Sequence, residues 1–133
     1  MKIKHLLLLF TLSAAMISIN ACKSEDDDHG DDHNDPVLTI TSPTENESFL
    51  GEVHIELTVT DESLHSLSIK VTKDSDGSVV YEDSPTVHDE TDYDYHEHFT
   101  PAGLSGLTDM TLTVVVEDHS AHVVTKTVKF TAQ

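Results

Sequence analysis

Apolar and polar residues alternate along most of residues 36–133, which is the pattern of β-strands with one buried face. The longest clean example is residues 52–60, where valine, isoleucine and leucine occupy every second position and polar residues lie between them. Turn-forming residues separate the alternating runs. The pattern predicts seven strands, at residues 37–41, 52–60, 67–71, 79–81, 93–99, 110–116 and 124–130.

No segment after the first 22 residues shows the 3.6-residue apolar period of an α-helix. Seven short strands in about 98 residues match the strand number and size of an immunoglobulin-like or fibronectin-III-like β-sandwich. We therefore predict an all-β domain at residues 36–133, preceded by two segments of different composition.

The turn between the third and fourth predicted strands, Asp74-Ser75-Asp76-Gly77, begins like a calcium-binding loop. Such a loop needs an acidic residue at its twelfth position, which here is Pro85. Aspartate, serine and glycine are also typical of hairpin turns. We therefore expect a β-hairpin at this position rather than an ion site.

The first of the two preceding segments, residues 1–21, has the composition of a secretory signal peptide. Lys2 and Lys4 precede an uncharged, mostly apolar run at residues 6–19, and Ala21 supplies the small residue at the expected cleavage position. The run is too short to span a bilayer as a helix, which takes about 20 residues. We expect this segment to be removed.

The only cysteine follows directly, and Ile19-Asn20-Ala21-Cys22 resembles a bacterial lipobox. The resemblance implies that Cys22 becomes the acylated N-terminus of a lipoprotein; an ordinary signal peptide with an incidental cysteine is the alternative. The next residues, 23–28, are a lysine and a serine followed by four acids, which looks like the surface-export signal of Bacteroidota lipoproteins. That resemblance implies a lipid-anchored protein exposed at the outer-membrane surface, whereas a charge run that only solvates a linker is the alternative.

Acidic residues dominate both the linker, residues 22–35, and the chain as a whole. The linker has no aliphatic residue and contains His29 and His33, so we expect a flexible tether. The chain carries 25 Asp and Glu against 7 Lys and Arg, a formal net charge of −18. Such a charge repels phosphate backbones, and we expect no nucleic-acid partner.

Several runs of the domain resemble bacterial Ig-like modules. These are residues 37–43, the strand that begins at Val53, the Thr60-Asp61 pair and residues 112–118. Asp118 matches the usual last strand pair, although Ala121-His122 stands where Gly-Asn is common. The whole chain is similar to uncharacterised Bacteroidota lipoproteins with one Ig-like domain. This resemblance implies fold and location, and it implies no activity.

The chain has ten histidines, nine of them after the predicted signal peptide, and this number suggests metal binding, since histidine is the commonest metal ligand of proteins. His96 and His98 are two residues apart on one strand, so their side chains share a face about 7 Å apart. In a fibronectin-III-like fold the neighbouring strand carries His54 and Glu56 on its outer face. These four side chains form the first candidate site, with donors that suit zinc; solvated surface imidazoles are the alternative.

The second candidate site lies where the loops after the second, fourth and sixth predicted strands meet, at the end where the linker enters. Carboxylates gathered there would repel one another, and a divalent cation would relieve this. Oxygen ligands favour calcium, and added histidine favours zinc, nickel or copper. A soluble acidic surface without an ion is the alternative. The candidate ligands are Asp61, Glu62, His65, Asp118, His119 and His122, and the same end also carries His88, Asp89, Glu90, Asp92 and the linker residues Asp31, Asp32, His33 and Asp35.

No nucleophile-elbow motif and no glycine-rich phosphate loop occurs in the sequence, and we expect no enzyme. The leading hypothesis is a lipid-anchored surface domain that binds divalent metal ions, zinc or calcium, through histidine and acidic side chains. The alternative is a metal-independent structural or adhesive module that contacts another protein through a threonine-rich face, comprising Thr111, Thr113, Thr125 and Thr127.

Overall fold

A computed structural model describes residues 34–133 of the chain. The predicted signal peptide, Cys22 and most of the predicted linker lie outside these residues. Among the residues described, no helix has the length and hydropathy that crossing a bilayer takes.

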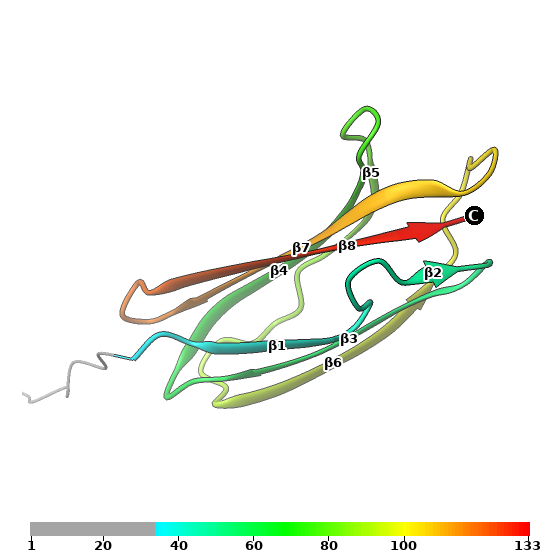
Figure 1. The fold of residues 1–133 in the computed structure, drawn as a ribbon. Coiled ribbons are helices and arrows are strands. Elements are labelled where there is room, and N and C mark those ends of the chain that lie inside the picture. Colours follow the sequence, from blue (N-terminus) through cyan, green and yellow to red (C-terminus); the bar gives the residue numbers. More distant parts are fainter. Residues whose placement is uncertain (1–33) are drawn as a thin grey trace, which may run out of the picture.

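Eight strands form two sheets that pack face to face (Figure 1). The smaller sheet has the order β1-β3-β6, and the larger has the order β2-β8-β7-β4-β5. The chain enters beside one end of the sandwich and finishes at the opposite end (Figure 1). The strands are β1 (Val37–Ser42), β2 (Ser48–Phe49), β3 (Val53–Thr60), β4 (Leu64–Lys73), β5 (Val79–Asp83), β6 (Asp92–Phe99), β7 (Thr108–Asp118) and β8 (Val123–Ala132).

The core lies between the two sheets and is built from the alternating positions of the sequence. All four apolar residues of β3 are buried, and so are those of β7 at Met110, Leu112, Val114 and Val116. The antiparallel pairing of β3 with β6 and of β5 with β4 confirms the predicted fibronectin-III-like order. The domain is an all-β, Ig-like sandwich.

The structure has one strand more than the seven predicted. β2 contains two residues, too few for an alternating pattern, and it pairs in parallel with the end of β8. Its Phe49 is buried with its ring edge-on to Phe130, at a centroid distance of 5.8 Å. This strand therefore forms through tertiary packing, and the local sequence pattern does not predict it.

The turn that begins at Asp74 joins β4 to β5 as a hairpin, as predicted. Gly77 has φ = +71°, which glycine adopts without steric cost. The Asp76 carboxylate accepts a hydrogen bond of 2.9 Å from the Ser78 backbone N–H. The Asp76 side chain thus stabilises the hairpin turn.

A hydrogen-bond network links the two sheets at the open side of the core. The Tyr95 hydroxyl on β6 donates to the Asp83 carboxylate on β5 at 2.8 Å, and it lies 2.5 Å from the Tyr81 hydroxyl. Burial, followed by these hydrogen bonds, raises the pKa of the Tyr95 hydroxyl, which therefore stays neutral and able to donate. The network joins the two edge strands β5 and β6 across the sandwich.

Replacing Tyr95 by phenylalanine should lower the free energy of unfolding by about 1–3 kcal/mol, because Asp83 and Tyr81 lose their shared partner in a half-buried position. Urea unfolding measures the change. Tyr93→Phe on the same strand is the matched control, since that hydroxyl has no hydrogen bond to the rest of residues 34–133. Equal stability of the two variants would contradict the proposed link.

Candidate metal-binding sites

Three connections of the chain meet at the end of the sandwich where the linker enters. They are the β3–β4 turn, the β5–β6 loop and the β7–β8 turn. Backbone hydrogen bonds fasten them: the Asp89 N–H donates to the Leu64 carbonyl at 2.9 Å, and the Leu64 N–H donates to the Glu90 carbonyl at 2.9 Å. The His119 N–H donates to the Ser63 carbonyl at 3.1 Å. The relative positions of the three connections are therefore set by the backbone.

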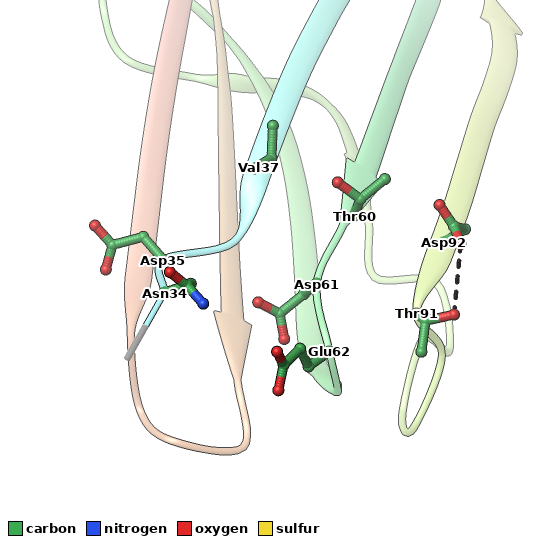
Figure 2. A pocket seen from close by; sticks show the side chains of 8 residues that line it. All are labelled: Asn34, Asp35, Val37, Thr60, Asp61, Glu62, Thr91 and Asp92. Atoms are coloured by element: carbon green, nitrogen blue, oxygen red, sulfur yellow. Dashed lines mark hydrogen bonds between the residues drawn. The ribbon is translucent and has the colours of Figure 1, made fainter. Parts of the chain in front are cut away.

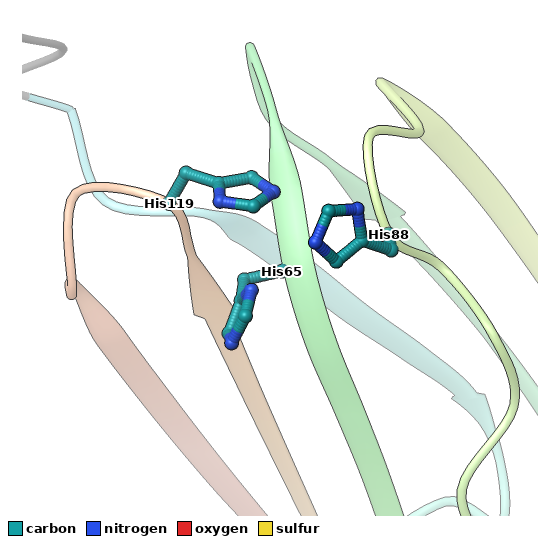
Figure 3. A group of neighbouring side chains, drawn as sticks. All are labelled: His65, His88 and His119. Carbon is teal, nitrogen blue, oxygen red and sulfur yellow. The ribbon is translucent and has the colours of Figure 1, made fainter.

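Three histidines at this end lie close together: His65 on β4 just after the first turn, His88 in the β5–β6 loop and His119 in the β7–β8 turn (Figure 3). His65, His88 and His119 each offer a ring nitrogen within 4.8 Å of the other two. The ring centroids are 5.4 Å apart for His65 and His88, 4.8 Å for His65 and His119, and 4.5 Å for His88 and His119. We call these three residues the end triad.

His65 reaches the end triad because β4 carries a β-bulge at that residue. Leu64 pairs with Asp118 and Ser66 pairs with Glu117, so His65 is the extra residue on β4. The bulge keeps Leu64 and Leu67 buried and leaves His65 exposed between them. Bulges commonly redirect a side chain at the end of a sheet, and this one directs the imidazole toward His88 and His119.

Asp89 connects two members of the end triad. One carboxylate oxygen lies 3.0 Å from His88 Nδ1 and the other lies 3.0 Å from His119 Nε2. The residue has φ = +67°, a conformation that aspartate tolerates better than most residues. Buried Val87 anchors the same loop in the core. A carboxylate in this place can orient both rings and raise their affinity for a cation.

Asp118 and His122, two of the candidate ligands, are paired with each other apart from the end triad. The Asp118 carboxylate is buried and accepts hydrogen bonds from the His122 N–H at 2.8 Å and from its ring Nδ1 at 2.7 Å. Burial alone would raise the pKa of Asp118, but these hydrogen bonds hold that pKa below its usual value of 3.8. This pair therefore shapes the β7–β8 turn, and neither residue belongs to the end triad.

Ala121 occupies the tight part of that turn with φ = +64°. A side chain in this left-handed region costs about 1 kcal/mol or more, which glycine avoids. Ala121→Gly should therefore raise the midpoint of thermal unfolding by several degrees, since 1 kcal/mol corresponds to about 4–8 °C in a domain of this size. Ala102→Gly is the control, because that residue is exposed and has no positive φ. A lower midpoint of thermal unfolding for Ala121→Gly would contradict the inference that Ala121 is strained.

Asp61 and Glu62, two further candidate ligands, are not grouped with the end triad. They line an acidic groove with Asn34 and Asp35 beside the entry of the chain (Figure 2). One oxygen of Asp61 also accepts the Ser63 N–H at 2.8 Å, which stabilises the β3–β4 turn. The structure therefore divides the predicted loop cluster into three parts, and only one of them is rich in imidazole.

The predicted sheet-face site lies at the other end of β3. In the register of β3 and β6, His54 is directly opposite His98, and Glu56 is directly opposite His96. Glu52, which precedes β3, groups with His54 and His98 so that one ligand atom of each lies within 4.8 Å of the others. The structure thus brings the four predicted side chains onto one face and adds a fifth.

Sequence reasoning placed His88 and Asp89 at the correct end but left them out of the candidate ligands, and it missed Glu52. The β5–β6 loop has no periodic pattern that fixes which of its residues turn inward. Glu52 lies two positions before His54 in the predicted strand at residues 52–60, so both side chains project from the same polar face. This spacing could have identified Glu52 as a candidate ligand.

No protein-family model and no curated protein matches the chain. Among solved structures, the fold is similar to an engineered protein with a TM-score of 0.54 and 18% identity, covering 74% of this chain. The chain spans 20% of that protein's length. It is also similar to CopC from Methylosinus trichosporium OB3b, with a TM-score of 0.51 and 15% identity, covering 74% of this chain and 93% of that one. At these identities the likeness shows the fold alone.

Proposed function

We propose that this protein binds a divalent transition-metal ion at the end triad. The observation that carries the proposal is the convergence of His65 from β4 with His88 and His119 from two separate connections, with their ligand nitrogens within 4.8 Å of one another. Residues this far apart in the sequence meet only because the fold and its backbone hydrogen bonds bring them together.

The donor set favours zinc or a similar ion over calcium. Imidazole nitrogens bind zinc at about 2.0–2.1 Å in tetrahedral geometry, which places neighbouring nitrogens about 3.4 Å apart. The nitrogens of the end triad lie within 4.8 Å of one another and their rings are exposed, so binding would require them to move closer together. Calcium takes six to eight oxygen ligands, which these three side chains do not supply. Asp89 would act as the carboxylate behind His88 and His119, leaving a fourth position for water or a partner's ligand.

The charge around the end triad also favours a cation. Residues 34–36, 61–63 and 84–91 contain acidic residues, and neither these segments nor residues 119–122 contain a lysine or arginine. Asp35, Asp61 and Glu62 line the acidic groove at the same end of the sandwich. The negative potential of these groups raises the local concentration of cations and offsets the positive charge of a bound ion.

A zinc titration tests the proposal. An ion that binds only the folded state raises its stability by about 2.7 kcal/mol when free zinc is 100 times the dissociation constant. The midpoint of thermal unfolding should therefore rise when zinc is added and fall back when a chelator removes it. An unchanged midpoint would favour the metal-independent module, whose threonines Thr113 and Thr127 lie side by side on the outer face of the larger sheet.

We further propose that the protein is anchored through Cys22 and exposed at the outer-membrane surface, as the lipobox-like segment suggests. Asn34 and Asp35 lie at the same end of the sandwich as the end triad, so the chain that leads from Cys22 would enter the domain at its metal-binding end. Residues 23–34 span at most about 40 Å when fully extended, so the start of the domain would stay within about that distance of the anchored residue. The protein would then hold metal ions close to the membrane as a binding module.

A further inference from the structure

We propose a second, independent divalent-metal site on the outer face of the smaller sheet, with Glu52, His54 and His98 as ligands and His96 as a positioning residue. It goes beyond the end triad, since it shares no residue with it. Its side chains come from β3, from β6 and from the residue just before β3. We call these residues, together with Glu56, the sheet-face cluster.

Strand register places the three ligands together. His54 and His98 are directly opposite in the antiparallel pair of β3 and β6, and their ring centroids are 4.0 Å apart. Glu52 lies two residues before His54, so its side chain projects from the same face. Directly opposite residues are the closest side-chain neighbours that a sheet offers. The backbone therefore holds these groups without any loop.

The distances between ligand atoms are close to those around a zinc ion. The Glu52 carboxylate oxygen Oε2 lies 3.3 Å from His98 Nδ1 and 3.7 Å from His54 Nε2. A tetrahedral ion with bonds of about 2.0–2.2 Å separates neighbouring ligand atoms by about 3.3–3.6 Å. One carboxylate oxygen therefore already faces both nitrogens at nearly the required spacing, and a fourth position remains open to solvent.

His96 contacts the other side of the His98 ring. The two Nε2 atoms are 2.7 Å apart and the rings are nearly parallel, with 16° between their planes. If His98 binds the ion through Nδ1, its Nε2 carries the proton and can donate it to His96 Nε2. Such outer partners fix the tautomer and orientation of a metal-bound histidine. His96 Nδ1 in turn lies 3.7 Å from a Glu56 carboxylate oxygen.

This assignment changes the ligand set that strand parity predicted. His54 and His98 remain ligands, Glu52 joins them, and His96 and Glu56 become supporting groups. The physical reason is that His98 has two ring nitrogens, one directed at Glu52 and the other at His96. His96 therefore acts through His98.

The sheet-face cluster combines two carboxylates with three imidazoles. No lysine or arginine is present in β3 or β6, so neither strand supplies a cationic side chain to offset the carboxylates. A bound divalent ion supplies the missing positive charge. The cluster also lies about 20 Å from the end triad, because His54 is near the start of β3 and the triad begins beyond its last residue. Occupation of one site should therefore leave the other unchanged.

Zinc binding by the full chain tests the second site. The protein is purified in detergent without a polyhistidine tag and with His29→Ala/His33→Ala, so that the N-terminal histidines do not contribute. Zinc is titrated in competition with a chromophoric chelator of known affinity. The expected result is two ions per chain, reduced to one by His98→Ala or Glu52→Ala, with melting in the absence of metal as the check on folding.

His96 has a distinct signature. His96→Ala should leave two ions per chain but weaken one of them about 10–100-fold, and His96→Gln should restore part of the affinity, because its amide oxygen can accept the His98 proton. Glu97→Gln, an exposed carboxylate between the two histidines, is the matched control and should change nothing.

Two outcomes overturn the second site: one ion per chain that is lost with His119→Ala, or two ions that persist in His98→Ala. One ion that is lost with His98→Ala but persists in His119→Ala would instead support the sheet-face cluster and overturn the end triad. The failures of the two proposals are therefore distinguishable.

Discussion

His119→Ala should remove one bound zinc ion from each chain and weaken binding at the end triad by at least about 100-fold. Loss of an outer carboxylate partner already costs about 10–100-fold in metal affinity, and loss of one of three ligands costs more. The zinc-dependent rise in the unfolding midpoint should shrink accordingly. The change leaves the core intact, since the His119 side chain is exposed at the rim of the β7–β8 turn.

Ser120→Ala is the matched control for this prediction, because Ser120 lies in the same turn and is exposed. It should bind zinc as the unchanged chain does. Asp89→Asn should give an intermediate loss of about 10–100-fold, since the amide keeps the shape of the carboxylate and loses its charge. If His119→Ala and Ser120→Ala bind zinc equally well, the end triad is not a metal site.

The sheet core could be predicted from the sequence because alternation reports burial directly. Val53, Ile55, Leu57 and Val59 alternate with polar residues, and a single register keeps them all in the core. The pairing of β3 with β6 followed from the fold class, and it placed His54 beside His98 as the parity of the two strands required. Sites built on strands are therefore accessible to sequence reasoning.

The end triad could be predicted only in part, because it depends on loops. His65 lies on a β-bulge, and bulges leave no clear pattern in one sequence. Asp118 looks like a ligand in the sequence, yet its carboxylate is 1% exposed and bonded to His122. Some acidic groups stabilise turns and others face a candidate ion site. Backbone hydrogen bonds between distant segments decide which role each group has. Residue type alone does not reveal this.

Cys22→Ala should move the protein from the membrane fraction to the medium or the periplasm when the chain is expressed in a bacterium with a lipoprotein pathway. Acyl chains contribute about 0.8 kcal/mol for each buried CH₂ group, so an acylated cysteine holds the chain firmly and its loss removes the anchor. Fractionation followed by immunoblotting measures the change. Ser24→Ala, two residues away, is the matched control and should stay with the membrane.

The same pair of variants separates anchoring from metal binding. Because Cys22 contributes no side chain to the end triad or to the sheet-face cluster, Cys22→Ala should bind as many zinc ions as the unchanged chain. A Cys22→Ala protein that still sediments with membranes would show that the anchor lies elsewhere, while unchanged zinc binding would leave both site proposals standing. The proposal about the membrane anchor and the proposals about metal binding are therefore tested independently of each other.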